Sequence, residues 1–218
     1  MSNSLKEKVV LCLGDSITAG ALSSSPQTSY VGRLKQLSGA LVVGYGSGGS
    51  RISKQTKPSD NPVLDRDFIL RSEQMQSVAD YVVVFGGTND FGHGDAPLGT
   101  LGDDSPYTFY GALFCLYTQL KSKYPTAKIV AVTPLHRKDE KAPLERGYYL
   151  SPLKDYVSAI KKVAEKFSVP VLDLFNSNEL TFKQKEKGEK YFSGDGLHPN
   201  DLGHEIIANE LYQFLLEV

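Results

Sequence analysis

The chain has 218 residues, a length that can bury one sizeable α/β core, and we expect residues 1–218 to form a single domain. Its 24 basic and 25 acidic residues nearly cancel, so the sequence lacks the positive field that attracts nucleic acids or anionic membranes. The two cysteines, Cys12 and Cys115, lie in apolar patterns that predict burial, and the apolar run after the polar N-terminus is too short for a signal peptide or membrane span. Two buried cysteines do not suggest a disulfide framework, which fits a reducing compartment. We therefore expect a cytoplasmic protein with no nucleic-acid partner and no membrane span.

Short apolar runs alternate along the chain with stretches of helical periodicity. Each run is nearly continuous in apolar residues, which is typical of parallel strands covered on both faces. The expected strands are Val9–Leu13, Leu41–Tyr45, Tyr81–Phe85, Ile129–Thr133 and Val169–Leu172.

Apolar residues three and four positions apart predict the helices between these strands. The expected helices begin near Tyr30, near Tyr110, near Leu153 and after Pro199, and residues 64–78 show a weaker pattern. Residues 91–106 and 134–152 are expected to be irregular. Five strand-then-helix units imply an α/β fold with a doubly wound parallel sheet, because each parallel pair needs a crossover.

Four polar, glycine-containing segments lie where the loops of such a sheet form its ligand crevice. Three follow the first three expected strands, and the fourth precedes the last helix. They are Gly14–Ser16, Gly44–Ser50, Gly86–Asp90 and Asp195–His198. We expect them to converge on one edge of the sheet.

Ser16 and His198 supply a nucleophile and a base. A serine hydroxyl attacks at neutral pH only if a base takes its proton, and an imidazole serves best when a carboxylate orients it. Asp195, three residues before His198, can supply that carboxylate. Taken alone, Ser16 is equally compatible with a helix cap.

The remaining segments offer hydrogen-bond donors for a developing oxyanion. Residues 46–49 can present a backbone N–H, and the side chain of Asn89 can present another. The alternatives are ordinary turns, with Asn89 and Asp90 stabilising one of them. The first glycine segment has no phosphate-binding pattern.

Other polar residues receive weaker assignments. His93 and His136 lie in expected rim loops where they could touch substrate, whereas His204 is expected to be a partly exposed structural residue of the last helix. Asp15 is assigned no chemical role. We expect no metal and no cofactor, because no set of ligands with coherent spacing is present.

Together these motifs resemble the GDSL, or SGNH, hydrolase family, in family order and across nearly the whole chain. The motifs are Gly14-Asp15-Ser16-Ile17, the glycines of residues 46–49, Gly87-Thr88-Asn89-Asp90 and Asp195-Gly196-Leu197-His198. The resemblance implies a flavodoxin-like three-layer α/β/α sandwich with a five-stranded parallel sheet. It also implies Ser16 as nucleophile, His198 as base and Asp195 as orienting acid, with the amides of Ser16 and Gly49 and the side chain of Asn89 forming the oxyanion hole. One departure is Gly44, where the family's second motif usually opens with asparagine.

The predicted activity is ester hydrolysis through an acyl-enzyme on Ser16, with a small-molecule ester as substrate. Polar rim loops favour a short, acetyl-like acyl group on a polar or carbohydrate alcohol. A lysophospholipase or thioesterase is the close alternative, in which Phe91, Phe109, Tyr148 and Tyr149 would line an acyl groove unless they pack in the core. A non-catalytic small-ligand module and a flavin or nucleotide protein of the same fold are further alternatives.

Overall fold

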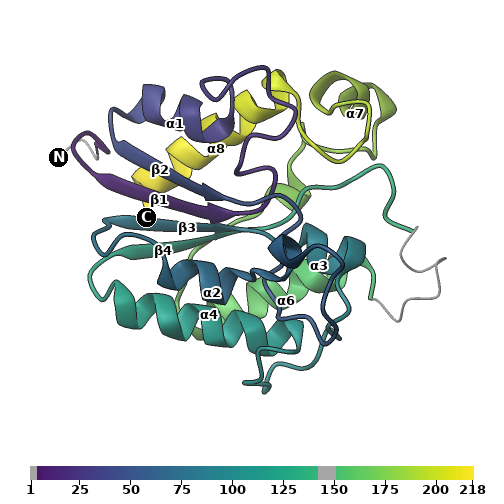
Figure 1. Ribbon diagram of the computed structural model, residues 1–218. Helices are drawn as coiled ribbons and strands as arrows, with labels where there is room; N and C mark the ends of the chain where they lie inside the picture. The colour runs from purple at the N-terminus through teal and green to yellow at the C-terminus, as the bar shows by residue number, and fades with distance from the viewer. Residues whose placement is uncertain (1–3, 142–150) are drawn as a thin grey trace.

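Five parallel strands form one sheet in the order β2-β1-β3-β4-β5 in the computed structural model, which describes residues 4–141 and 151–218. The strands are β1 (Val9–Gly14), β2 (Leu41–Gly46), β3 (Tyr81–Phe85), β4 (Lys128–Val132) and β5 (Val171–Leu172). Helices cover both faces of this sheet (Figure 1), so the predicted three-layer α/β/α fold with a five-stranded parallel sheet is confirmed.

The helices divide between the two faces and the edge where the strands end (Figure 1). One face carries α1 (Tyr30–Ser38) and α8 (Asp201–Glu217), and the other carries α2 (Phe68–Glu73), α4 (Phe109–Lys123) and α6 (Leu153–Lys166). The short helices α3 (Thr88–His93) and α7 (Lys185–Tyr191) lie at that edge, and two 3₁₀ turns, η1 (Pro62–Asp65) and η2 (Leu174–Asn176), complete the described elements.

Side chains of each strand alternate between two apolar cores, one on each face of the sheet. In β1, Leu11 and Leu13 join the core beneath α2, α4 and α6, whereas Val10 and Cys12 join the core beneath α1 and α8. All four are fully buried. This two-sided burial explains why the strands are continuous apolar runs rather than alternating ones.

The first three strands end at the same level, which creates the rim where the polar segments meet. Gly14 of β1 pairs in register with Gly46 of β2 and with Phe85 of β3. At Gly46 a Cβ atom would lie 2.1 Å from the backbone nitrogen of Ala19, so only glycine lets the segment after Ser16 cross the end of β2.

Several predicted elements differ from the observed ones. β5 contains only two residues rather than four, because Pro170 has no N–H to donate to a neighbouring strand. Residues 64–78 split into η1 and α2, and residues 88–93 form helix α3 where a turn was expected. Cys115 is half-buried rather than buried, although Cys12 is buried as predicted.

The prediction that His204 is partly exposed is wrong. Its side chain on α8 is completely buried against α1, where Nδ1 accepts a hydrogen bond of 3.2 Å from the backbone N–H of Tyr30. Burial lowers the pKa of His204 to about 4. His204 therefore joins two helices in its neutral form.

Candidate active site

Ser16 lies in the turn that follows β1. The carboxylate of Asp15 accepts a hydrogen bond of 2.9 Å from the Ile17 N–H, and the carbonyl of Ser16 accepts one of 2.9 Å from the Ala21 N–H. These bonds hold the half-buried side chain of Ser16 at the rim of the sheet. Burial raises the pKa of Asp15 to about 6, even though the Ile17 N–H and the Arg71 guanidinium act to lower it.

Asp195 and His198 come from the loop between α7 and α8. Asp195 Oδ1 accepts hydrogen bonds of 3.0 Å from the backbone N–H groups of Leu197 and His198, while its Oδ2 lies 2.6 Å from Nδ1 of the His198 ring. The loop is closed by the Ser193 N–H, which donates to the His198 carbonyl at 2.8 Å. One carboxylate thus shapes the turn and contacts the imidazole at the same time.

The other ring nitrogen of His198 reaches Ser16. Nε2 of His198 lies 2.8 Å from Oγ of Ser16, although the two residues are 182 positions apart in the chain. For Asp195, the hydrogen bonds from the His198 ring and from two backbone N–H groups outweigh desolvation, so its pKa lies below the usual range. An ionised Asp195 favours the tautomer with the proton on Nδ1, which leaves Nε2 as an acceptor for the serine hydroxyl.

Residues 47–50, which follow β2 and form what we call the glycine loop, pass beside Ser16. A Cβ atom on Gly48 would lie 3.9 Å from Cβ of Ser16, and Gly49 has a φ of +71°, a conformation that glycine adopts without strain. The buried Asn89 at the start of α3 donates from Nδ2 to the carbonyl of Ser50 at 3.0 Å. Since an amide nitrogen carries two N–H donors, Asn89 has a second one beyond this bond.

Sequence reasoning missed Arg71, which holds the glycine loop from α2. Its guanidinium donates to Oγ of Ser50 at 2.7 Å, to the carbonyl of Gly14 at 3.0 Å and to the carbonyl of Tyr45. Burial lowers its pKa to about 10, which still leaves it cationic at neutral pH. The only signal in the sequence is one basic residue in the otherwise apolar start of α2.

Asp90 of α3 fixes the continuation of the same loop. Its carboxylate accepts from the N–H groups of Ile52 and Ser53, both at 2.9 Å, and from the Ser53 hydroxyl at 2.5 Å. The sequence suggested a turn-stabilising role for Asp90, and the structure instead shows it bridging α3 to the glycine loop. Gly44 occupies the position where the family motif has asparagine, and in this chain Arg71, Asn89 and Asp90 hold the loop.

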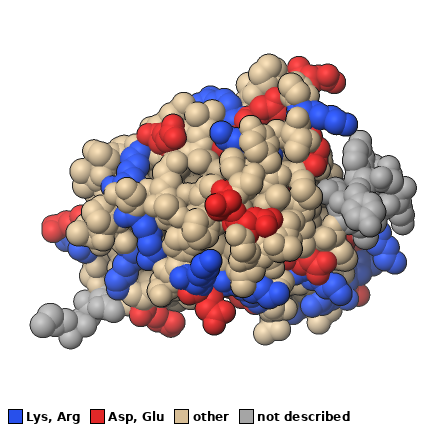
Figure 2. Space-filling model, turned by 90° about the horizontal axis from the view of Figure 1, so that it is seen from below, with Lys and Arg blue, Asp and Glu red and all other residues tan. Residues whose placement is uncertain are grey.

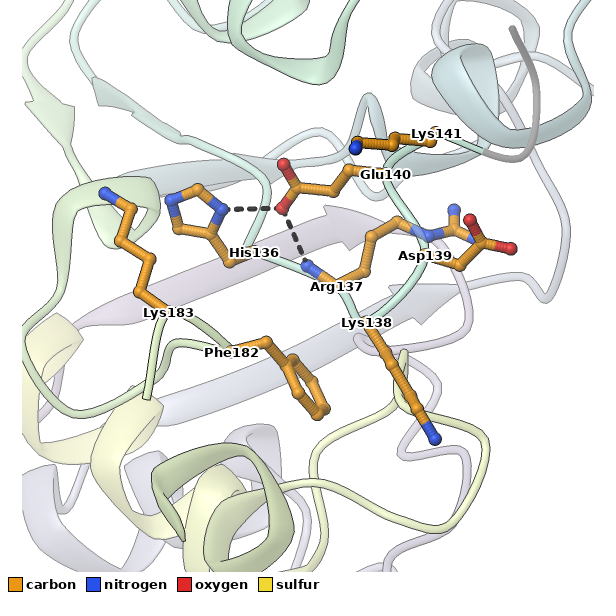
Figure 3. Close-up of a pocket in the computed structure, with 8 residues that line it drawn as sticks. All are labelled: His136, Arg137, Lys138, Asp139, Glu140, Lys141, Phe182 and Lys183. Carbon is orange, nitrogen blue, oxygen red and sulfur yellow. Dashed lines mark hydrogen bonds and ion pairs between the residues drawn. The ribbon is translucent and has the colours of Figure 1, made fainter. Parts of the chain in front are cut away.

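A pocket of about 520 Å³ lies between the segment after β4 and residues 182–183 (Figure 3). His136 is inside it, with Nδ1 2.5 Å from Oε1 of Glu140 and its ring stacked on Phe175 at 3.9 Å. The N–H of Lys138 donates to the Gly196 carbonyl at 2.8 Å, which joins this segment to the loop of Asp195 and His198.

The other candidates from the sequence lie at the end of α3 and in the core. His93 is exposed at the end of α3, with its ring nitrogen 3.2 Å from the Arg51 guanidinium. Phe91 and Phe109 are fully buried in the core, and Tyr148 and Tyr149 lie outside the described residues. No group of three potential metal ligands occurs among residues 4–141 and 151–218. Within the same residues, no helix has the length and apolarity to cross a membrane.

A family model described as GDSL-like Lipase/Acylhydrolase family matches residues 12–206. No curated protein matches the chain. One solved crystal structure is 32% identical over 99% of both chains, with a TM-score of 0.84. A protein from Lactobacillus plantarum is 31% identical over 97% of both chains, with a TM-score of 0.79. The crystal structure of an acetyl xylan esterase is 21% identical, covers 95% of this chain and 99% of its own, and has a TM-score of 0.63, a likeness of fold.

Proposed function

Since the chain belongs to the GDSL-like Lipase/Acylhydrolase family, we propose that it is a serine esterase that hydrolyses carboxylic esters through an acyl-enzyme on Ser16. The contacts from Asp195 to His198 and from His198 to Ser16 are the observation that carries the proposal. A hydroxyl bonded to an imidazole that is itself bonded to a carboxylate is the arrangement that activates serine for acyl transfer.

In the proposed first step, Nε2 of His198 takes the proton of Ser16 while Oγ attacks the ester carbonyl carbon. Asp195 stabilises the imidazolium that forms. The negative charge on the former carbonyl oxygen is stabilised by the amides of Ser16 and Gly49 and by the second N–H of Asn89. Each such donor typically lowers the barrier by about 3 kcal/mol.

The tetrahedral intermediate then collapses, and the bond to the alcohol breaks. Nε2 of His198 gives its proton to the leaving alkoxide, which departs as the alcohol and leaves the acyl group on Ser16. A water molecule repeats the cycle with His198 as base, and the carboxylic acid is released. The proposed reaction uses no cofactor and no metal.

We propose a short acyl group, such as acetyl, on a polar or carbohydrate alcohol as the substrate class. The exposed charged residues Lys138, Asp139 and Lys141 of the segment after β4 support it (Figure 3). This segment is bonded through Lys138 to Gly196 of the loop that carries Asp195 and His198, and its charged side chains suit a hydroxylated alcohol. A lysophospholipase or thioesterase is the second candidate. It is favoured by an adjoining pocket of about 510 Å³, which shares Lys138 and Phe182 with the first and is also lined by Phe192 and by residues of the loop that carries Asp195 and His198.

The test is a hydrolysis panel of chromogenic esters from acetyl to long acyl chains, run beside acetylated oligosaccharides and acyl-thioesters. We expect turnover of acetyl esters, with the highest kcat/KM on an acetylated sugar, and complete loss of turnover in a folded Ser16→Ala variant. Full activity in Ser16→Ala would refute the acyl-enzyme. Binding of a small ligand without any turnover would favour the non-catalytic module instead.

A further inference from the structure

The segment that follows the glycine loop folds back over it and places Leu64 against Gly49. A Cβ atom built on Gly49 would lie 2.4 Å from Cδ2 of Leu64, so the leucine side chain occupies the space that any side chain at position 49 would need. Leu64 is half-buried, which leaves part of its surface open. It is therefore an apolar group in direct contact with a residue that we assign to the oxyanion hole.

Arg51 holds Leu64 in this position. Its buried guanidinium donates to the Leu64 carbonyl at 3.0 Å and pairs with Asp65 at 3.0 Å. It also donates to the Ser59 hydroxyl at 3.0 Å and to the His93 carbonyl at 3.3 Å, and so joins the η1 turn that contains Leu64 to α3. Because Arg51 lies two residues after Gly49, the turn and the glycine loop are fixed to each other.

The direction from which Leu64 approaches determines which part of the ester it faces. Leu64 belongs to η1, which precedes α2 on one face of the sheet, whereas His198 precedes α8 on the other face (Figure 1). The leaving alkoxide must face His198 to receive its proton. In the proposed mechanism the acyl chain therefore extends away from His198, on the side of the glycine loop that Leu64 occupies.

We infer that Leu64 is a specificity-determining residue that closes the acyl side of the site and limits the acyl group to a short chain. The inference rests on the proposed function. An oxyanion bound to the Gly49 amide lies about 2.9 Å from its nitrogen, and the carbon atoms of the acyl chain begin one bond beyond the carbonyl carbon. A longer chain extending on this side meets the isobutyl group of Leu64.

The experiment compares Leu64→Ala with Val63→Ala in the full chain. Val63 is the neighbouring residue of the same turn and is 51% exposed, so its truncation removes a similar apolar group that does not contact Gly49. The measured quantity is the ratio of kcat/KM for p-nitrophenyl hexanoate to that for p-nitrophenyl acetate. Because a methylene that fits or clashes changes kcat/KM by ~10–200-fold, we expect the ratio to rise at least about tenfold in Leu64→Ala and to stay unchanged in Val63→Ala.

A second variant and a second measurement keep the inference testable if Leu64→Ala folds poorly. Leu64→Phe adds bulk at the same place and should lower the ratio. Labelling rates of Ser16 by ethyl and octyl fluorophosphonates report the same preference without turnover. An unchanged ratio and unchanged relative labelling in both Leu64 variants would overturn the inference. A wild-type protein whose Ser16 reacts with neither probe would instead contradict the proposed function.

Discussion

The two oxygens of the Asp195 carboxylate have different partners, and this separates its structural and chemical contributions. Oδ1 accepts from two backbone N–H groups of the loop, and Oδ2 contacts the His198 ring. Asparagine at this position can keep its carbonyl oxygen toward the backbone while its amide N–H₂ faces the imidazole. It therefore removes the acceptor for Nδ1–H but not the acceptor that shapes the turn.

We predict that Asp195→Asn lowers kcat by about 10³–10⁴-fold, as expected when the imidazole is held in the wrong tautomer, while thermal unfolding changes little. Asp195→Ala should lower both activity and Tm, because it also leaves the Leu197 and His198 N–H groups without their acceptor. Steady-state kinetics and calorimetry on the two variants measure this. Wild-type kcat in Asp195→Asn would contradict the assigned role.

His204 predicts a loss of stability in mild acid. Its pKa is about 4 in the folded chain against 6.5 as the ordinary value. Between these values the unfolded chain binds a proton that the folded chain does not, so the free energy of unfolding falls as pH drops from 6.5 toward 4. The full effect is about 3 kcal/mol.

A matched variant isolates this contribution. His204→Asn offers an oxygen near the position of Nδ1 as acceptor for the Tyr30 N–H but carries no titrating ring. Asp15, whose pKa is raised by burial to about 6, has the opposite effect, because its folded form gains a proton first and is stabilised as pH falls below 6. Both proteins retain Asp15, so its contribution cancels when they are compared. The difference in free energy of unfolding between wild type and His204→Asn, measured by urea unfolding from pH 8 to pH 4, should shrink or reverse in acid. A constant difference would contradict the burial of a neutral imidazole.

At the scale of elements, the ends of β1 and β2 and the glycine loop are tied together by α2 through Arg71. We predict that Arg71→Met destabilises the protein by about 3 kcal/mol, because buried acceptors of a charged donor are left unpaired. It should also lower kcat/KM through displacement of the loop. Arg66→Met is the control, since Arg66 lies in the same segment but is exposed, with its bond of 2.6 Å to Gln74 at the surface. Equal effects in urea unfolding and ester kinetics would refute the assignment.

Elements with a strong apolar pattern were predictable from the sequence, and those held by polar contacts were not. β1 and β3 were expected within one residue of where they lie, because buried parallel strands must be continuously apolar. Helix α3 was missed because its six residues include Gly92 and no apolar periodicity. Of its four buried residues only Phe91 is apolar, and the polar Asn89 and Asp90 are specified by contacts with a loop distant in the sequence.

The same distinction applies to the site. Ser16, Asp195 and His198 could be proposed from the sequence because each lies at a strand or helix end with a characteristic neighbour pattern. The contacts that hold Gly49, from Arg71 and Asp90 through Ser50 and the residues after it, depend on three-dimensional packing and have no local signature.

At the scale of the whole molecule, the two apolar cores share one sheet. Every strand of that sheet contributes to at least one of them, and β1 contributes fully buried residues to both. Charges of both signs are interspersed on the face shown in Figure 2, in keeping with a net charge of −1. Loss of either core therefore exposes one face of strands on which the other core also depends.

We predict that residues 1–218 unfold as a single cooperative unit, as one domain. Calorimetric and van't Hoff enthalpies should agree, and fluorescence of the tyrosines should report the same midpoint as far-UV circular dichroism. Two resolved transitions would show that the helical layers unfold separately.

Covalent labelling of Ser16 tests the central claim most directly. The wild-type protein is treated with a fluorophosphonate probe, and the site of modification is identified by peptide mass spectrometry beside Ser16→Ala and His198→Ala. We predict one adduct per chain on the peptide that contains Ser16, none in Ser16→Ala and much slower labelling in His198→Ala. Absence of an adduct in the wild type, or equal labelling of Ser16→Ala, would contradict the account.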